Sequence, residues 1–189
     1  QPSTEYDNRE STGPNARQLL PFPVYTVASI TSSDGLYPSH TTTYAYEGGM
    51  WNPARREFNG FGKVTVTDPL GLTRIHWFHQ AGGRDYSGQG EWEDSTTAFA
   101  KRGLPFRVET YGTNGALYGV TLNQVQDADL GNGRHFAFIA QTVSLDYPGN
   151  TNAYRATAQQ FAYDLGTGNL TNTVLLGEVT NVAVASHAF

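Results

Sequence analysis

Two histidines and two groups of acidic residues are the side chains in this sequence whose spacing could support chemistry. His76 and His79 flank Trp77-Phe78. Successive side chains of a strand point to opposite faces, so two residues three positions apart cannot chelate one metal without distortion. We therefore expect both histidines to be ordinary strand-surface residues.

The first acidic group has the residue types of a glycosidase site, with Glu91, Glu93 and Asp94 beside Trp92. Glycoside hydrolysis needs two carboxylates held about 5 to 10 Å apart on rigid elements. These residues fall in the Gly-rich stretch 81–94, which predicts a loop. A solvated loop is therefore favoured, and a hydrolase stays open only if a glutamate meets another carboxylate in a closed pocket.

The second acidic group, Asp127-Ala128-Asp129, has the opening of a calcium-binding loop. An EF-hand would need Gly at the position of Asn132 and a bidentate Glu at the position of Phe138, so that motif is excluded. A looser calcium turn remains an alternative to the favoured interpretation, an Asp-rich hairpin turn. We expect neither a metal nor a cofactor.

Charge and composition exclude several function classes. The net charge is −5 and no run of Lys or Arg occurs, so the clustered cations that bind nucleic-acid phosphates are missing. No stretch approaches the roughly 18 consecutive apolar residues of a membrane span. The sequence has no cysteine, which excludes disulfides and thiolate metal sites.

The elements that must position these residues are strands. Aromatic residues make up 13% of the chain and 21 residues are Gly, while charged residues reach only 15%, against about 25% in typical domains. Apolar residues alternate with polar ones, and turn signals such as Asp34-Gly35, Asp68-Pro69 and Asn114-Gly115 recur between the runs. The fold class predicted is all-β, with antiparallel strands and hairpins. The expected strands cover 24–31, 41–49, 62–69, 73–80, 104–112, 116–126, 136–147, 154–164 and 171–186, with an irregular segment at 48–57 and a short helical turn at 95–102.

The chain divides into a polar segment, 1–18, and an apolar-patterned remainder, 19–189. We expect the first to be a flexible N-terminal arm and the second to be one antiparallel β domain. The sequence starts at Gln1 rather than at a Met, and its first residues do not have the pattern of a secretory signal. We therefore expect an excised fragment of a longer protein.

One segment has a more specific pattern than composition alone. Residues 44–68 contain an aromatic pair, a Gly, another aromatic residue, basic residues, and then Arg-x-Phe-x-Gly-Phe-Gly-x-Val and an acidic residue. This pattern resembles the segment that precedes the repeats in the B components of Tc insecticidal toxins and in related virulence-plasmid and Rhs proteins. The residues that carry it are Tyr44, Tyr46, Gly49, Trp51, Arg55, Arg56, Phe58, Gly60, Phe61, Gly62, Val64 and Asp68.

A second segment, 161–171, is similar to a YD repeat. The usual form is Tyr-Asp, two residues, then Gly-Asn-Leu, whereas here three residues separate Tyr163-Asp164 from Gly168-Asn169. In such a hairpin the Tyr ring packs on the sheet, the Asp accepts backbone N–H groups, and Gly-Asn takes the positive-φ position.

Structural roles suffice for the first motif as well. The three-residue spacing of Phe58 and Phe61 around Gly60 predicts a bend or bulge. Arg55 or Arg56 is expected to stack on Trp51 or to pair with Glu57 or Asp68.

The resemblance implies a non-catalytic segment of a YD-repeat shell that encapsulates and delivers a toxic effector. Its partners would be the remaining strands of the parent shell and other toxin-complex components, in a secreted or cell-surface bacterial protein. The alternative is an extracellular carbohydrate-binding β-sandwich, which would display Trp51, Trp77 and Trp92 together on one open face.

Overall fold

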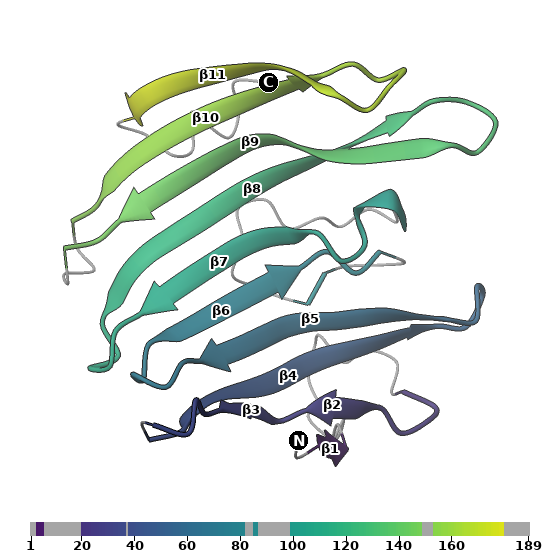
Figure 1. The fold of residues 1–189 in the computed structure, drawn as a ribbon. Coiled ribbons are helices and arrows are strands. Elements are labelled where there is room, and N and C mark those ends of the chain that lie inside the picture. The colour runs from purple at the N-terminus through teal and green to yellow at the C-terminus, as the bar shows by residue number, and fades with distance from the viewer. Residues whose placement is uncertain are drawn as a thin grey trace.

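The protein is an open, antiparallel sheet in the computed structural model, which describes residues 3–5, 20–36, 38–81, 85–86, 99–148 and 153–179. The described strands form a nine-stranded sheet ordered β11-β10-β9-β8-β7-β6-β5-β4-β3 and a two-stranded sheet of β1 and β2 (Figure 1). The bounds are β1 Ser3–Glu5, β2 Tyr25–Val27, β3 Ser29–Ser32, β4 His40–Asn52, β5 Glu57–Thr67, β6 Thr73–Phe78, β7 Pro105–Tyr111, β8 Leu117–Asp129, β9 His135–Asp146, β10 Arg155–Tyr163 and β11 Leu170–Val179, with one 3₁₀ turn, η1, at Phe99–Lys101.

Each strand of the large sheet pairs with the next strand along the chain, so the sheet is a meander and the predicted all-β class is confirmed. The predicted turns explain this order because each lies between two paired strands. Asp34 accepts the N–H of Leu36 through its side chain, and Asp68 accepts those of Leu70 and Leu72. Short side chains that bind nearby backbone N–H groups close such turns locally.

Several predicted boundaries differ from the structure. The single strand expected at 24–31 is divided between β2 and β3, and β5 begins at Glu57 rather than at residue 62. Residues 48–52, expected to be irregular, continue strand β4 as far as Asn52, because a left-handed Gly48 (φ 66°) absorbs the irregularity inside the strand. Within the expected helical turn at 95–102, η1 covers Phe99–Lys101, and residues 95–98 lie outside the described residues. β1 lies inside the segment expected to be an arm and pairs with β2. The division into an arm and one domain stays a prediction.

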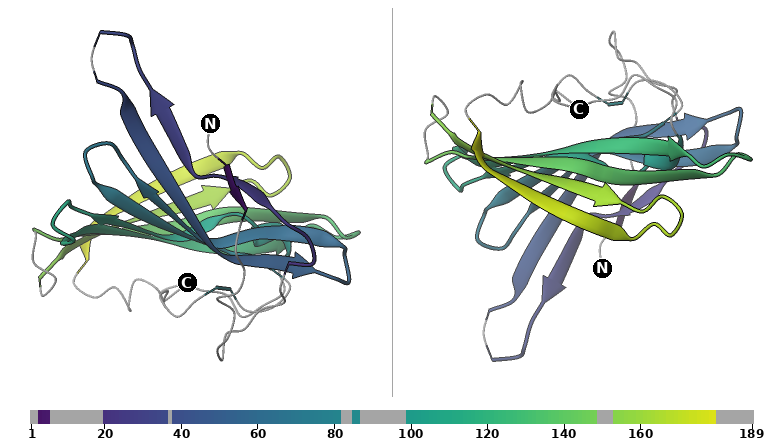
Figure 2. Two further views of the ribbon diagram at one scale, coloured as in Figure 1. Left: turned by 90° about the horizontal axis from the view of Figure 1, so that it is seen from below. Right: turned by 90° about the horizontal axis from the view of Figure 1, so that it is seen from above.

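The sheet is strongly twisted. Figure 2 shows the hairpin of β3 and β4 swinging far out of the plane that β8, β9 and β10 define. Right-handed twist accumulates from strand to strand in such open sheets. No helix in the described part of the chain is long and apolar enough to cross a membrane.

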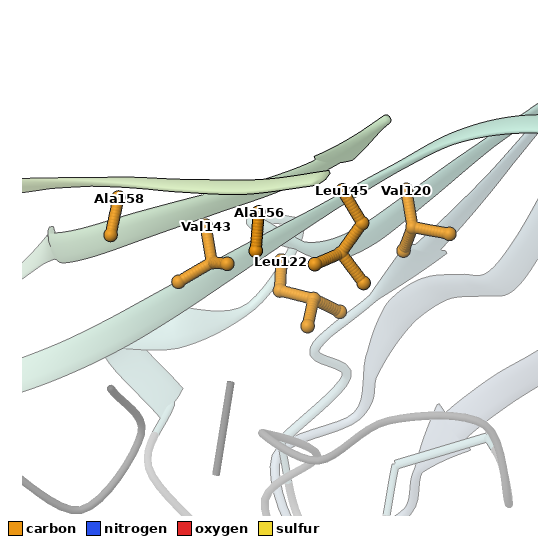
Figure 3. Packing of buried hydrophobic residues seen from close by; sticks show 6 residues of the cluster. All are labelled: Val120, Leu122, Val143, Leu145, Ala156 and Ala158. Carbon is orange, nitrogen blue, oxygen red and sulfur yellow. The ribbon is translucent and has the colours of Figure 1, made fainter. Parts of the chain in front are cut away.

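The buried apolar core lies on one face of β8, β9 and β10. Cross-strand partners build it, since Leu122 pairs with Val143 and Val143 with Ala158. Figure 3 shows the six side chains projecting from the same side of these strands. Paired residues on one face are the unit of sheet stabilisation. The cluster consists of Val120, Leu122, Val143, Leu145, Ala156 and Ala158.

Truncating the centre of this core tests its weight in folding. Leu122 is 2% exposed, so Leu122→Ala should lower the free energy of unfolding by about 2 to 5 kcal/mol through lost burial and a cavity. Leu36→Ala is the matched control, because Leu36 is 84% exposed at a hairpin tip. Urea unfolding followed by circular dichroism measures both. Equal losses in the two variants would contradict this location of the core.

Candidate functional site: the β4–β5 hairpin and its anchored loop

The first sequence motif forms a single hairpin. The ring centroids of Tyr46 and Phe61 lie 4.9 Å apart, and those of Phe58 and Phe61 lie 5.3 Å apart. The second motif forms a different hairpin, β10–β11, and strands β6 to β9 lie between the two. Tyr44, Tyr46 and Trp51 lie on β4; Phe58, Gly60, Phe61 and Gly62 lie on β5; Arg56 lies in the turn between these strands, and Asp68 follows β5.

The bulge expected at Gly60 is present. Gly49 pairs with Phe61 and Trp51 with Phe58, so β5 carries one more residue than β4 across this stretch. Gly60 has φ 85°, a left-handed conformation that side chains other than Gly rarely adopt. The bulge bends β5 where residues from elsewhere in the chain contact the hairpin.

A tyrosine ring occupies the space left by two glycines of this hairpin. A Cβ atom built on Gly48 would lie 2.4 Å from the Tyr86 ring, and one built on Gly62 would lie 2.1 Å from Tyr86 Cβ. Both distances are far shorter than van der Waals contact, so the ring lies directly against the strand backbone. The Tyr86 ring also stacks on Trp77, with centroids 6.2 Å apart.

The phenol of Tyr86 belongs to a charged network. Its hydroxyl donates to Glu47 Oε2 over 3.1 Å, and Lys63 Nζ donates to Glu47 Oε1 over 2.5 Å. Lys63 Nζ lies 5.3 Å from the Trp77 ring centroid. Glu47 and Lys63 face each other across β4 and β5, so the tyrosine is fixed by a cross-strand ion pair at one end and by two glycines along its ring.

Carboxamides attach the same loop to the bulge. Gln80 Nε2 donates to the carbonyl oxygens of Gly48, over 2.6 Å, and Gly60, over 3.0 Å. Asn59 Nδ2 donates to the Ala81 carbonyl over 3.1 Å. Gln80 therefore satisfies carbonyls of the bulged hairpin, and Asn59 on the bulge satisfies a carbonyl of the loop.

The prediction that His79 is a strand-surface residue is wrong. His79 is 1% exposed, and its Nδ1 lies 2.5 Å from Asp85 Oδ2. The other carboxylate oxygen of Asp85 accepts the backbone N–H of Gln80 over 2.8 Å. The chain folds back after β6 and places Asp85 over the histidine, a tertiary event that strand periodicity does not encode.

The two histidines have separate environments. His76 stacks on Phe78, with centroids 6.1 Å apart, whereas His79 contacts Phe106 at 4.9 Å. Burial, and then the nearby Arg74 charge, lower the pKa of His76. Neither histidine belongs to a group of three potential metal ligands within the part of the chain that the structure describes.

Arg55 and Glu57 at the turn have other partners than those expected. The Arg55 guanidinium lies 3.7 Å from the ring centroid of Phe99, and Glu57 pairs with Arg102 over 2.7 Å. Both partners come from η1 and the turn after it, which are distant in sequence. Sequence-local reasoning therefore could not select them.

The turn of the second motif has the predicted geometry. Asp164 Oδ1 accepts the N–H of Gly166 over 2.9 Å, and Oδ2 accepts the Thr167 hydroxyl over 2.8 Å. The Thr167 hydrogen bond, and then the Gly166 N–H, lower the pKa of Asp164. Gly168 is left-handed, with φ 75°. The Tyr163 ring packs on Phe138, with centroids 5.0 Å apart.

The carboxylates of the calcium-like turn bind protein groups. Asp129 Oδ1 accepts the N–H of Gly131 over 2.8 Å, and Asp127 Oδ2 lies 3.1 Å from Nδ1 of His135. This is the geometry of the Asp-rich hairpin turn. The possible glycosidase group, Glu91, Trp92, Glu93 and Asp94, lies outside the described residues.

Sequence reasoning missed a buried charged group on β7. Glu109 is 5% exposed, and its carboxylate accepts hydrogen bonds from Arg107 Nε over 2.7 Å and from the Tyr111 hydroxyl over 2.9 Å. Burial, the hydrogen bond and the Glu109 charge raise the pKa of Tyr111 to about 12. The available signal was the Arg-x-Glu-x-Tyr alternation, which places all three residues on one face of a strand.

Comparison with known proteins agrees with the first motif. Residues 1–75 match the family described as insecticide toxin TcdB, middle/N-terminal region. The resemblance to the B components of Tc toxins is confirmed. The match covers the anchored β4–β5 hairpin and ends within β6. No curated protein is significantly similar in sequence to this chain.

Solved structures share the fold. The crystal structure of TcdB2-TccC3 matches with a TM-score of 0.66 at 20% identity over 90% of this chain. A Photorhabdus luminescens Tc holotoxin pore, carrying the mutation TccC3-D651A, matches with a TM-score of 0.69 at 19% identity over 86% of this chain. This chain covers only 11% and 10% of those two chains, so it has the fold of a small part of each.

A methyl group at Gly62 tests the Tyr86 anchor of this Tc-toxin-like fold. Gly62→Ala should lower the free energy of unfolding by about 1 to 3 kcal/mol, because the new Cβ overlaps Tyr86 and Gln80. Gly119→Ala is the control, since its Cβ meets only Leu145 O at 3.7 Å. Both are measured by urea unfolding. Adding Tyr86→Gly, which removes the overlapping Cβ and ring, should reduce the cost of Gly62→Ala; a purely additive double variant would contradict the anchor.

Alkaline pH tests the Glu109–Tyr111 contact. A tyrosine in the unfolded chain has a pKa near 10, whereas in the fold the pKa of Tyr111 is about 12. The native state therefore favours the neutral phenol, and this contribution to stability is complete below about pH 10 and lost as pH rises toward 12. Tyr111→Phe should flatten the stability profile in that window, measured by urea midpoints at successive pH values. A profile parallel to that of the parent would show that Tyr111 does not contribute.

Proposed function

We propose that this chain is a non-catalytic wall segment of a hollow Tc/Rhs-type β-shell that encloses a toxic effector. The shell would be secreted or located at the bacterial cell surface. The segment's partners would be the neighbouring strands of the shell and other components of the toxin complex. One observation carries the proposal: the described sheet is a single-chain meander that stays open at both edges.

Strand β11 presents the clearer open edge. Among the described strands it pairs only with β10, and Figure 1 shows it at the border of the sheet. Four large apolar residues of β11 are exposed, with Leu175 at 72%. Soluble domains usually protect an edge strand with charges, prolines or a cover. An apolar edge therefore supports a sheet that continues into further strands. The four residues are Leu170, Val174, Leu175 and Leu176.

The polar clusters support a structural role over catalysis. The His79–Asp85 pair is 2% exposed at both side chains, and Glu109 is closed off by Arg107 and Tyr111. A catalytic base must reach a substrate proton within hydrogen-bond distance. In these clusters, the side chains that could act as a base are closed off. They hold a loop or a strand face in place.

The alternative, a carbohydrate-binding module, would need an open aromatic platform. Trp77 is only 7% exposed, and Trp51 contacts Phe22 edge-on at 5.0 Å. Trp92 lies outside the described residues. The described tryptophans therefore favour the wall segment.

Self-association of the isolated chain tests the proposal. Light scattering combined with circular dichroism should find β-rich assemblies that grow with protein concentration, because open edges pair with one another. Leu175→Lys places a charge on the β11 edge and should reduce the assembly. Leu70→Lys makes the same change at a residue that is 76% exposed in the β5–β6 turn, and it should leave assembly unchanged.

A β-rich monomer at every concentration would contradict the wall-segment proposal, and a glycan screen would then test the alternative. Enclosure is tested in a full-length shell protein carrying this segment, by limited proteolysis of its effector. Val143→Asp puts an unpaired charge into the core of the wall and should expose the effector to protease, whereas Leu70→Lys should not. An effector equally digested in the parent and both variants would show that the wall encloses nothing.

A further inference from the structure

Three Asn-Gly dipeptides occur in this sequence, at Asn59-Gly60, Asn114-Gly115 and Asn132-Gly133. An asparagine followed by glycine is the dipeptide most prone to spontaneous deamidation, because no side chain on the next residue hinders attack by its backbone nitrogen. The reaction needs a free carboxamide, an accessible backbone nitrogen and room for the chain to rotate. The structure gives these conditions unequally to the three sites.

The first dipeptide is protected by burial. Asn59 is 2% exposed, its Nδ2 donates to the Ala81 carbonyl over 3.1 Å, and Arg102 approaches its Oδ1 at 3.4 Å. Gly60 is held in the bulge of β5. Rotation of the Asn59 side chain would break the attachment of the loop to the hairpin, so reaction there requires local unfolding.

The second dipeptide is exposed, but its reacting groups are engaged. Asn114 Oδ1 accepts the N–H of Ala116 over 3.0 Å. The backbone N–H of Gly115 donates to the Gly112 carbonyl over 2.9 Å. Both the electrophilic carboxamide and the nucleophilic nitrogen are therefore held by the β7–β8 turn.

The third dipeptide lies at the tip of the β8–β9 hairpin and has no such protection. Asn132 and Gly133 are exposed, and neither makes a hydrogen bond within the described residues. A Cβ built on Gly133 would meet nothing within 4 Å. Asn132 itself is held left-handed, at φ 56°, a conformation that costs free energy for a residue with a side chain.

We propose that Asn132 is a deamidation site of this protein, at which the folded chain converts before Asn59 or Asn114. The Gly133 nitrogen, having lost its proton to water or hydroxide, attacks Cγ of Asn132. The bond from Cγ to the side-chain nitrogen breaks, that nitrogen takes up a proton, and ammonia leaves a cyclic succinimide. Water then opens the ring at either carbonyl, giving aspartate or isoaspartate.

Both products change the hairpin tip. Either one adds a carboxylate close to Asp129, whose side chain already caps the turn through the Gly131 N–H. Isoaspartate also lengthens the backbone by one methylene, which is incompatible with the hydrogen bond from the Arg134 N–H to the Gly131 carbonyl at 3.1 Å. The reaction therefore loosens this turn irreversibly without a cleavage of the chain.

Incubation of the intact folded chain in mildly alkaline buffer, followed by peptide mapping with mass spectrometry, tests the site. Asn132 should convert several-fold faster than Asn59 and Asn114, and an isoaspartyl methyltransferase should label the same peptide. In denaturant the three sites should convert at similar rates, because protection by the fold is gone. Asn114→Ser is the matched control and should leave the rate at Asn132 unchanged, whereas Asn132→Ser should abolish the fastest conversion.

Conversion of Asn59 or Asn114 as fast as Asn132 in the folded chain would overturn the proposal. The proposal would also be overturned if the three sites reacted in denaturant at rates that differ in the same order as in the folded chain. The selectivity would then come from the sequence rather than from the structure. The test is independent of the shell function, because it needs only the folded chain.

Discussion

The structure depends on one constraint, the antiparallel hydrogen-bonded pairing between strands that follow one another in the chain. Every pair from β3–β4 to β10–β11 is antiparallel. Because a side chain changes face with each residue, a slip of one position would expose the core partners Leu122 and Val143. The register is defined locally, by turns such as those at Asp68 and Asp164. A meander of this kind needs no long-range crossover.

The ladder alone would leave β4 and β5 with a bare, bulged surface. Gly48 and Gly62 leave space there, and the segment that follows β6 fills it with Tyr86 and Gln80. Glycines in a strand are destabilising. This cost is offset by the packing of the Tyr86 ring and by the hydrogen bonds from Gln80 to the carbonyls of Gly48 and Gly60. Gly48 and Gly62 are thus the surface on which Tyr86 packs, whereas Gly60 is needed for the left-handed bulge.

Buried polar groups are also paired within the fold. His79 and Asp85 pair beneath the returning loop, and Glu109 is satisfied by Arg107 and Tyr111 on its own strand. A buried charge without partners would destabilise the sheet strongly. Among the described strands, β11 presents an open apolar edge that is available for contact with further chain, as the proposed wall segment requires.

The sequence by itself determined the class, the order of hairpins, the bulge at Gly60 and the turn chemistry of Asp164, because these follow from alternation and from residues close in the chain. It also carried the resemblance to Tc toxin B components. Only the tertiary structure decided that His79 is buried, that Arg55 meets Phe99, and that Tyr86 lies on Gly48 and Gly62. Those contacts join segments that are far apart in the sequence and that meet only when a loop closes. Periodicity does not indicate which distant segment will pack on which face of the sheet.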